Sequence, residues 1–523
     1  MKVRRGLPDP DGRAVRSPAS SSTPWERLLN SVARTAALVA GAVAMLVAPL
    51  AAMKALRDPD DPRLSVGAAP AATLVPGDVR DATGRMIAGA VWTGLMSYDP
   101  RTGSPVPAAA ESVTSGDRKV WTVRLRPGGR FHDGTPVTAR SFTDAWTAVV
   151  REGWHGARTI SETAGLKGLK VTDDRTFEVT LDRPLNGFPA LLGDPAFLPM
   201  PESVLRSRDW AAYGRRPIGN GPYRITSHGR ETVLERPNAR TIVVKSIPKP
   251  SDQYSAVELN RLDVATAVPS DRHETMDTEF RDRHLTLPGR AMTYLAFPSW
   301  EDRFTPAIRQ TLSMAIDRSA ITEGPLGHQA TPANSLVPPG VLPGRREGQC
   351  RLCIHDPRAA TAALTDAGGL NGTLNLWHEA SDAAWVEAVA EQLRKTLTID
   401  VQPRRVTAAE LRTALDERKV DGPFVVHTTT PYPAPVAALR PLLEAGTGYE
   451  GEDVSDLITQ AESAPTPDAG VTPARLAESA LLRDMAAIPL WSAHDHFVWS
   501  ERLHKITTDP FTGLNLTTLK PKN

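Results

Sequence analysis

Hydrophobic and polar residues alternate strictly in several short segments of the chain, which is the pattern of strands with one buried face. Residues 120–126 read VWTVRLR, and residues 176–181 read TFEVTL. In the first segment, Trp121, Val123 and Leu125 are expected to face inward, because successive side chains of a strand point to opposite faces. Alternating or continuous apolar runs predict further strands at 63–68, 241–247, 373–378, 423–430 and 488–491.

Other segments carry apolar residues at the three- and four-residue spacing of an amphipathic helix. Helices are predicted over residues 85–97, 141–150, 303–317, 356–369 and 472–486. The helix at 356–369 has the clearest ends, with Asp356 as N-cap, Pro357 in the first position and Gly368 as C-cap. Such helices, mixed with alternating strands and long connections, predict an α/β body with mixed sheets.

The N-terminal region combines a basic segment with an apolar one. Residues 1–34 hold seven Lys and Arg against three Asp and Glu, and the nineteen residues 35–53 carry no charge. A helix of that length just spans a hydrocarbon core of about 30 Å. Because basic flanks stay in the cytoplasm, the chain after residue 54 is expected outside. An uncleaved transmembrane anchor is predicted, and a cleaved secretory signal is the alternative.

Composition narrows the classes of function. The chain has 523 residues, enough for about three folding units, and 41% are hydrophobic and 23% charged, which excludes a mostly disordered chain. Lys and Arg number 61 against 60 Asp and Glu. Because there is no basic excess, no nucleic acid partner is expected.

The chain contains two cysteines, Cys350 and Cys353, in a single CxxC motif. Zinc would require a second pair of ligands. A thioredoxin-type redox pair would open a helix inside a βαβ unit, whereas the predicted helix here begins only after Asp356. Outside the cytoplasm a small structural disulfide is therefore expected, with the redox pair as the alternative.

Motifs of catalytic and metal sites are scarce. The sequence contains no GxSxG, HExxH, GxxxxGK[ST] or GxGxxG motif. On a strand, His494 and His496 would share one face and Asp495 would point to the other, but the sequence supplies no third metal ligand beside the two histidines. We therefore expect no catalytic residue, no metal and no cofactor.

Several segments together resemble the extracellular solute-binding proteins of family 5, the peptide- and nickel-binding receptors of bacterial ABC importers. The longest match is residues 90–146, which begin AVWTGLMSYDP and end with LRPGGRFHDGTPVTARSFTDAW. Further matches follow in the family's order at 217–225, 241–265, 308–321, 356–368 and 488–491. The resemblance covers residues 62–523.

The resemblance implies a two-lobed periplasmic-binding-protein fold with hinge-crossing strands, mixed sheets and an extra subdomain on the first lobe. The first crossing is expected at 241–247, and the return at 487–491. The expected organisation is a basic, disordered cytoplasmic segment at 1–34, the anchor or signal at 35–53, a linker at 54–63, lobe I with its subdomain at 64–247, lobe II at 248–486 and the return to lobe I at 487–523.

The resemblance also implies a receptor that is not an enzyme. It would capture a peptide-like or other small polar solute between the lobes by hinge closure and present it to ABC permease subunits. It would act as a monomer held at the membrane by the N-terminal helix, with its body extracytoplasmic. Two alternatives are a membrane-anchored sensor or assembly protein of the same fold that is not coupled to import, and a secreted hydrolase, against which the missing catalytic motifs argue.

Ligand contacts are expected at the ends of the second-lobe strands and on the closing strand. The candidates are Trp300, Trp377, His378, Glu379, His427, Tyr432 and Trp491. Peptide-binding members of the family carry a "W.AD" segment after a central strand of the second lobe, and its aspartate pairs with the α-amino group of the ligand.

The chain departs from this pattern. Thr428 and Pro431 stand where the tryptophan and the aspartate would be, and proline offers neither a charge nor an N–H. Ordinary free-amine peptides are therefore expected to bind weakly, unless Asp495 or Glu379 takes over in a different ligand register. A second departure is that no lipid-modifiable cysteine follows the apolar run.

Overall fold

The computed structural model describes residues 62–99, 102–341, 348–444, 451–509 and 511–522. The basic segment at 1–34, the predicted anchor at 35–53 and most of the linker at 54–63 lie outside the described residues. Within the described ranges, no helix is both long enough and apolar enough to cross a bilayer.

One large sheet runs through the described body, in the order β15-β14-β16-β12-β17-β11-β1-β10-β9-β8, and β13 pairs with β17 beside this path. The strands are β1 (Leu64–Ala68), β8 (Arg224–Ser227), β9 (Glu231–Glu235), β10 (Ile242–Ser246), β11 (Val264–Ala265), β12 (His284–Ala296), β13 (Ala330–Pro332), β14 (Leu374–His378), β15 (Val401–Arg405), β16 (Phe424–Thr429) and β17 (Ala487–Trp499).

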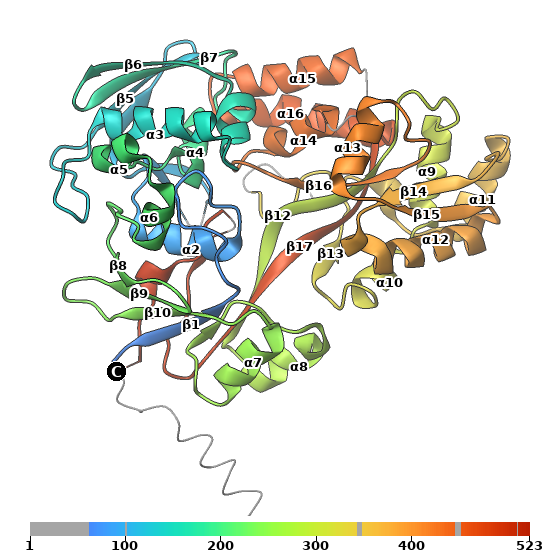
Figure 1. Cartoon of the computed structure of the whole chain (residues 1–523). Coiled ribbons are helices and arrows are strands. Elements are labelled where there is room, and N and C mark those ends of the chain that lie inside the picture. The colour runs from blue at the N-terminus through green and yellow to red at the C-terminus, as the bar shows by residue number, and fades with distance from the viewer. Residues whose placement is uncertain (1–61, 100–101, 342–347, 445–450, 510, 523) are drawn as a thin grey trace, which may run out of the picture. The chain divides into compact units, whose positions relative to one another are not determined.

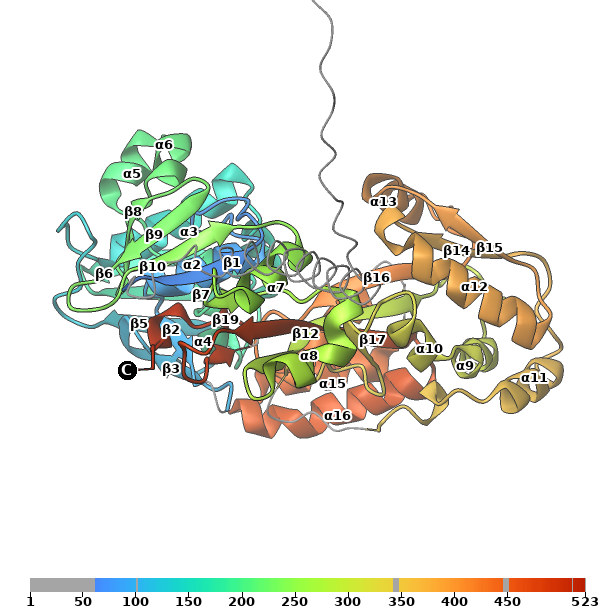
Figure 2. The same ribbon diagram turned by 90° about the horizontal axis from the view of Figure 1, so that it is seen from below.

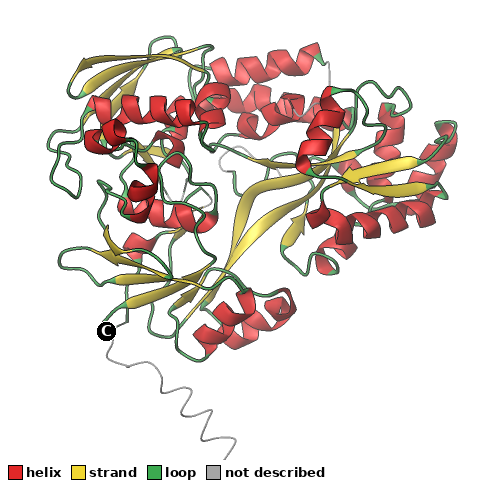
Figure 3. Ribbon diagram, in the orientation of Figure 1, coloured by secondary structure: helices red, strands yellow, loops and turns green. Residues whose placement is uncertain are grey.

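Two long strands, β12 and β17, join the two halves of this sheet. They are antiparallel partners from His284↔Val498 at one end to Ala296↔Ala487 at the other. At the first end β17 pairs with β11, and at the second β12 pairs with β16. Figure 1 shows both strands passing from the region of β1 and α7 toward β14 and β15, and Figure 3 shows them as long yellow arrows. They are the hinge-crossing strands of the two lobes.

The first crossing differs from the expectation. The strand expected to cross, 241–247, is β10, and it pairs with β1 and β9 inside lobe I. The crossing is made by β12 instead, whose middle reads Pro288-Gly289 and so looks like a turn in the sequence.

The segment between β10 and β12 also lies with lobe I, although the expected boundary at 248 assigned it to lobe II. It contains α7 (Pro250–Glu258) and α8 (His273–Phe280). Strand β11 pairs with β1, and Tyr254, Phe280 and Val498 share one apolar cluster. Seen from below, α8 lies beside the crossing strands (Figure 2).

The subdomain on lobe I is a four-stranded sheet in the order β4-β5-β7-β6. Its strands are β4 (Ala110–Thr114), β5 (Val120–Leu125), β6 (Leu166–Asp173) and β7 (Thr176–Leu181). The predicted inward residues of β5, Trp121, Val123 and Leu125, are at most 6% exposed, which confirms the alternation. Helix α3 (Ala139–Glu152) covers this sheet and begins with a capping box between Thr138 and Ser141.

The rest of lobe I consists of short elements. They are α2 (Ala82–Val91), β2 (Met96–Tyr98), β3 (Pro105–Pro107), α4 (Phe188–Leu191), α5 (Glu202–Ser207), α6 (Trp210–Arg215), β18 (Thr508–Asp509) and β19 (Gly513–Leu514). Helix α2 begins earlier than predicted because the Asp81 side chain accepts a hydrogen bond from the backbone N–H of Gly84 and caps it there.

Lobe II places helices around parallel strands. Strand β14 pairs in parallel with β15 and β16. Its helices are α9 (Pro306–Ala315), α10 (Arg318–Glu323), α11 (Pro357–Asp366), α12 (Ala383–Leu397) and α13 (Ala408–Asp416). The predicted N-cap of α11 is confirmed, since Asp356 accepts a hydrogen bond from the N–H of Ala359. The C-cap is Ala367, and the predicted Gly368 follows it with a φ of 82°.

Three further helices, α14 (Pro435–Glu444), α15 (Glu452–Ser463) and α16 (Pro467–Arg483), follow β16, and α15 contacts the segment after β7 of the lobe I subdomain. The side chain of Asn186 donates to the carbonyl oxygen of Ala461 at 2.8 Å. Glu462 is 2% exposed and forms ion pairs with Arg183 and Arg440. These buried contacts form a second link between the two lobes.

Candidate functional site

The register between the two crossing strands shifts at two places, and the first shift lies between Pro288 and Met292 of β12. Pro288 pairs with His494 and Met292 pairs with Ser492, so residues 289–291 of β12 lie opposite the single residue Ala493. A Cβ atom on Gly289 would lie 2.0 Å from the carbonyl oxygen of Ala493, so glycine is required for this close approach. Such an irregularity disrupts pairing and changes the direction of the neighbouring side chains.

A pocket of about 180 Å³ lies at this bulge. Its walls come from both lobes and from the crossing strands: Ala82 and Arg85 of α2, residues 288–291 of β12, Thr429 of β16, residues 493–495 of β17 and residues 511–513 of the C-terminal segment. A neighbouring pocket of about 230 Å³ between α2 and the C-terminal segment shares Arg85, Phe511 and Thr512 with it. We call the first one the bulge pocket.

Asp495 supplies the negative charge of the bulge pocket. Its carboxylate is reachable by solvent, yet burial among the pocket walls raises its pKa and outweighs the opposite effects of His494 and Arg290. The neighbouring histidines turn to the other face of β17, as predicted: the rings of His494 and His496 lie 4.5 Å apart. The Nε2 atom of His494 donates to the carbonyl oxygen of His328 at 2.9 Å.

The two guanidinium groups of the bulge pocket are engaged with the protein. Arg85 forms an ion pair with Asp194 at 3.0 Å. Arg290 donates to the carbonyl oxygen of Thr430 at 2.8 Å, and its guanidinium carbon lies 5.2 Å from the centre of the Phe511 ring. The two arginines of the pocket therefore already have partners within the protein, and the pocket also holds an acidic group on β17.

None of the seven residues predicted as ligand contacts lines the bulge pocket. Trp300 and Trp377 belong to the core of lobe II, where their indole N–H groups donate to the Val420 carbonyl and the Asp421 carboxylate, each at 2.9 Å. Trp491 is 4% exposed and packs edge-on against Trp385.

The polar candidates also lie away from the bulge pocket. His378 is buried with its Nδ1 atom 2.7 Å from the Glu379 carbonyl oxygen, and the Glu379 side chain is half-buried at the end of β14. The exposed His427 lies 3.2 Å from the carboxylate of Asp382. Tyr432 is buried against Gly187, and burial raises the pKa of its hydroxyl.

The residues that do line the pocket gave weaker signals in the sequence. Nothing in the sequence marked Arg85, Arg290 or Thr429 as binding residues. The sequence suggested Asp495 only as a substitute for the missing acidic anchor. It stands between His494 and His496, which drew attention to the opposite face of the strand. A Pro-Gly pair inside an apolar strand was the one available sign of the bulge.

The sequence of the chain matches a known protein family. Residues 104–450, more than half of the chain, match the family described as "Bacterial extracellular solute-binding proteins, family 5 Middle". The chain belongs to this family. As a family 5 protein it is an extracytoplasmic solute-binding protein, and its resemblance to that family is confirmed.

Family 5 relatives match over most of the chain. The periplasmic murein peptide-binding protein MppA of Escherichia coli strain K12 is 26% identical over 449 residues, which cover 77% of this chain and 82% of that protein. The dipeptide-binding protein DppE of Bacillus subtilis strain 168 is 24% identical over 460 residues, which cover 79% and 83%.

Solved family 5 structures share the fold. The unliganded open form of MppA gives a TM-score of 0.74 at 20% identity and covers 89% of this chain and 98% of that one. HbpA2 from Haemophilus parasuis gives a TM-score of 0.76 at 18% identity, with 88% and 100% covered. The predicted two-lobed α/β fold is thereby confirmed.

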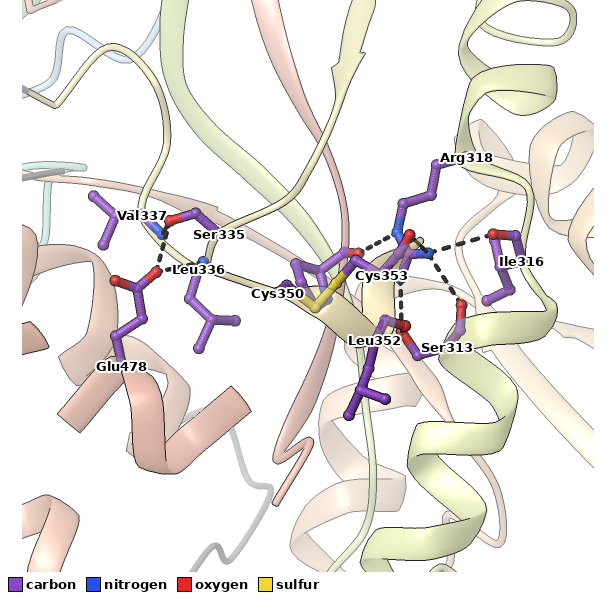
Figure 4. The surroundings of a disulfide bond; sticks show 11 residues. Ser313, Ile316, Arg318, Ser335, Leu336, Val337, Cys350, Leu352, Cys353 and Glu478 are labelled. Carbon is purple, nitrogen blue, oxygen red and sulfur yellow. Dashed lines mark hydrogen bonds between the residues drawn. A yellow bond between two sulfur atoms is a disulfide. The ribbon is translucent and has the colours of Figure 1, made fainter. Parts of the chain in front are cut away.

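One of the family 5 segments, residues 308–321, surrounds a disulfide (Figure 4). Cys350 and Cys353 are joined by an S–S bond. The hydroxyl of Ser313 donates to the carbonyl oxygen of Leu352, and Arg318 donates to that of Cys353, both at 2.8 Å. This segment therefore holds the CxxC loop in place through these two hydrogen bonds.

Proposed function

We propose that this protein is the receptor of an ABC importer and captures a peptide-like or other small polar solute between its lobes. The observation that supports this most directly is the bulge pocket, whose walls come from α2 of lobe I, β16 of lobe II and both crossing strands. Small-molecule sites prefer such interfaces between domains. Relatives named for murein peptides and dipeptides favour a peptide-like solute.

The proposed mechanism is capture by hinge closure. Rotation of the lobes about β12 and β17 would bring α2 and the C-terminal segment toward β16 and enclose the solute. The solute favours the closed form to the extent that it binds that form more tightly. The permease then recognises the closed form, and the protein releases the solute chemically unchanged.

We further propose that residues 35–53 anchor the receptor in the membrane with residues 1–34 in the cytoplasm, because an uncharged run follows a basic flank. Protease treatment of intact cells should remove the body and leave a short protected fragment. A fully soluble product that begins near residue 53 would instead identify a cleaved signal.

The test of the receptor function uses the full-length protein purified from its native host in mild detergent. Native mass spectrometry should detect a small solute bound to the protein, and solute released by denaturation should be taken up by wild-type cells but not by a strain that lacks this chain. Recovery of no solute, together with unchanged uptake of labelled peptides by the deletion strain, would contradict the proposed function.

A further inference from the structure

The carboxylate of Asp495 has no partner among the described residues. It makes neither a hydrogen bond nor an ion pair there, although it lines the bulge pocket. Strand alternation separates it from His494 and His496, whose rings lie together on the opposite face of β17. The acidic group is thus presented to the pocket and not to the protein.

Neither arginine of the pocket forms an ion pair with Asp495, although the charges of His494 and Arg290 act to lower its pKa. Arg85 pairs with Asp194, and Arg290 donates to the Thr430 carbonyl and lies over the Phe511 ring. Desolvation by the walls raises the pKa of Asp495 and outweighs the opposite effects of those two charges. The walls of the pocket thus disfavour the charged form of Asp495 although solvent reaches the carboxylate, and a bound cation would favour that form.

The position where the family carries its acidic anchor offers no such group. Pro431 and Thr428 supply no charge, and Thr428 of β16 pairs with Met292 of β12. Strand β12 lies between β16 and β17 in the sheet, and Asp495 is on β17. An acidic anchor at Asp495 would therefore lie two strands away from the end of β16, on β17.

We propose that Asp495 binds a protonated amine of the solute, which enters the cleft in a register shifted toward the crossing strands. This inference rests on the proposed receptor function. The class of solute is an amine-bearing small molecule, such as a short peptide with a free N-terminus. The guanidinium groups of Arg85 and Arg290 keep their contacts with the protein and so hold the walls of the pocket in place. The ammonium group would form a charge-assisted hydrogen bond, the strongest kind available in such a pocket.

The test uses the full-length protein and a mixed library of tripeptides, in one form with free N-termini and in the other with acetylated N-termini. Binding is followed by native mass spectrometry and calorimetry at pH 7. We expect wild-type protein to bind members of the free-amine library and to lose about ten- to a hundredfold in affinity for their acetylated copies. Asp495→Asn should bind the free-amine members with a similar loss.

The matched control is Asp366→Asn, the same chemical change at an exposed position at the end of α11. It should bind like the wild type, and thermal unfolding should show that both variants are folded. Equal affinity for free and acetylated peptides, unchanged binding by Asp495→Asn, or no binding of either library would overturn the role of Asp495. The receptor function would stand in those cases if a native solute without an amine were recovered and imported.

Discussion

Arg318 is a guanidinium buried without an acidic partner among the described residues. It is 3% exposed and donates to the carbonyl oxygens of Ser313, Cys353 and Pro489 at 3.0, 2.8 and 2.7 Å. Burial lowers its pKa to about 9. One side chain thereby holds the end of α9, the disulfide loop and the crossing strand β17 together.

We expect Arg318→Met to destabilise the protein by roughly 3–5 kcal/mol, because it leaves several buried carbonyl groups without donors. Chemical denaturation measures this loss. The matched control is Arg358→Met on the exposed surface of α11, which should change stability by less than about 0.5 kcal/mol. Equal denaturation midpoints for the two variants would show that the carbonyl groups find other donors.

His496 lies in a group of imidazoles beside the crossing strands. Its ring centre is 3.9 Å from that of His273 and 4.5 Å from that of His494, and its Nε2 atom is buried without a partner among the described residues. Burial, with the neighbouring charges of His273 and His494, lowers its pKa from 6.5 to about 3. The folded protein therefore keeps this imidazole neutral in mildly acidic solution.

This neutrality makes stability depend on pH. Between pH 6.5 and about 3 the unfolded chain binds a proton at His496 that the folded chain does not. Stability is thus fully present above pH 6.5 and falls as the pH decreases, by up to about 1.4 kcal/mol per pH unit. We expect His496→Leu to reduce the loss of thermal stability between pH 7 and pH 5, and replacement of the exposed His504 by Leu to leave it unchanged.

At the scale of the elements, the bulge in β12 depends on the missing side chain of Gly289. A methyl group there would meet the Ala493 carbonyl oxygen, which belongs to the backbone and cannot rotate away. We expect Gly289→Ala to cost about 1–3 kcal/mol of stability and to weaken solute binding, since the strands must shift where the pocket forms. Gly229→Ala, where an added Cβ meets nothing within 4 Å, is the control in the same denaturation and binding assays.

The disulfide loop makes a smaller contribution than its buried position suggests. Cys350 and Cys353 are 4% and 8% exposed, and their bond closes a loop of only a few residues. Because loop-closure entropy grows with loop length, replacing both by serine should cost about 2 kcal/mol or less. Alkylation without reductant should label neither cysteine in the native protein. Rapid labelling of both would support a redox pair instead.

Local patterns predicted those elements whose signals are complete within a few residues. The alternation of β5 and the N-cap of α11 needed only their own sequence. The sequence of β12 concealed its role, since Pro288 and Gly289 look like a turn and only pairing with β17 makes the segment a strand. The aromatic candidates do not line the bulge pocket. Sequence alone does not separate them from core residues, because a hydrophobic core and a binding site both bury aromatic side chains.

At the scale of the whole molecule, the lobes are linked twice. The crossing strands form the first link, and the second joins Asn186 and Arg183 of the subdomain to Glu462 and Ala461 of α15. Sequence reasoning found the first link only in part and the second not at all, because its residues lie 275 or more positions apart in the chain. The order of family segments, by contrast, was sufficient to predict the two-lobed fold.

The position of the bulge pocket on the crossing strands has a consequence for the kinetics of capture. Points close to a rotation axis move little, so Asp495 and Ala493, both on β17, keep nearly the same surroundings when the lobes rotate. A solute can therefore be held at this pivot before closure, and α2, which is not part of the sheet, supplies contacts that closure adds. Association should then follow two phases, a concentration-dependent encounter and a slower step whose rate saturates at high solute concentration.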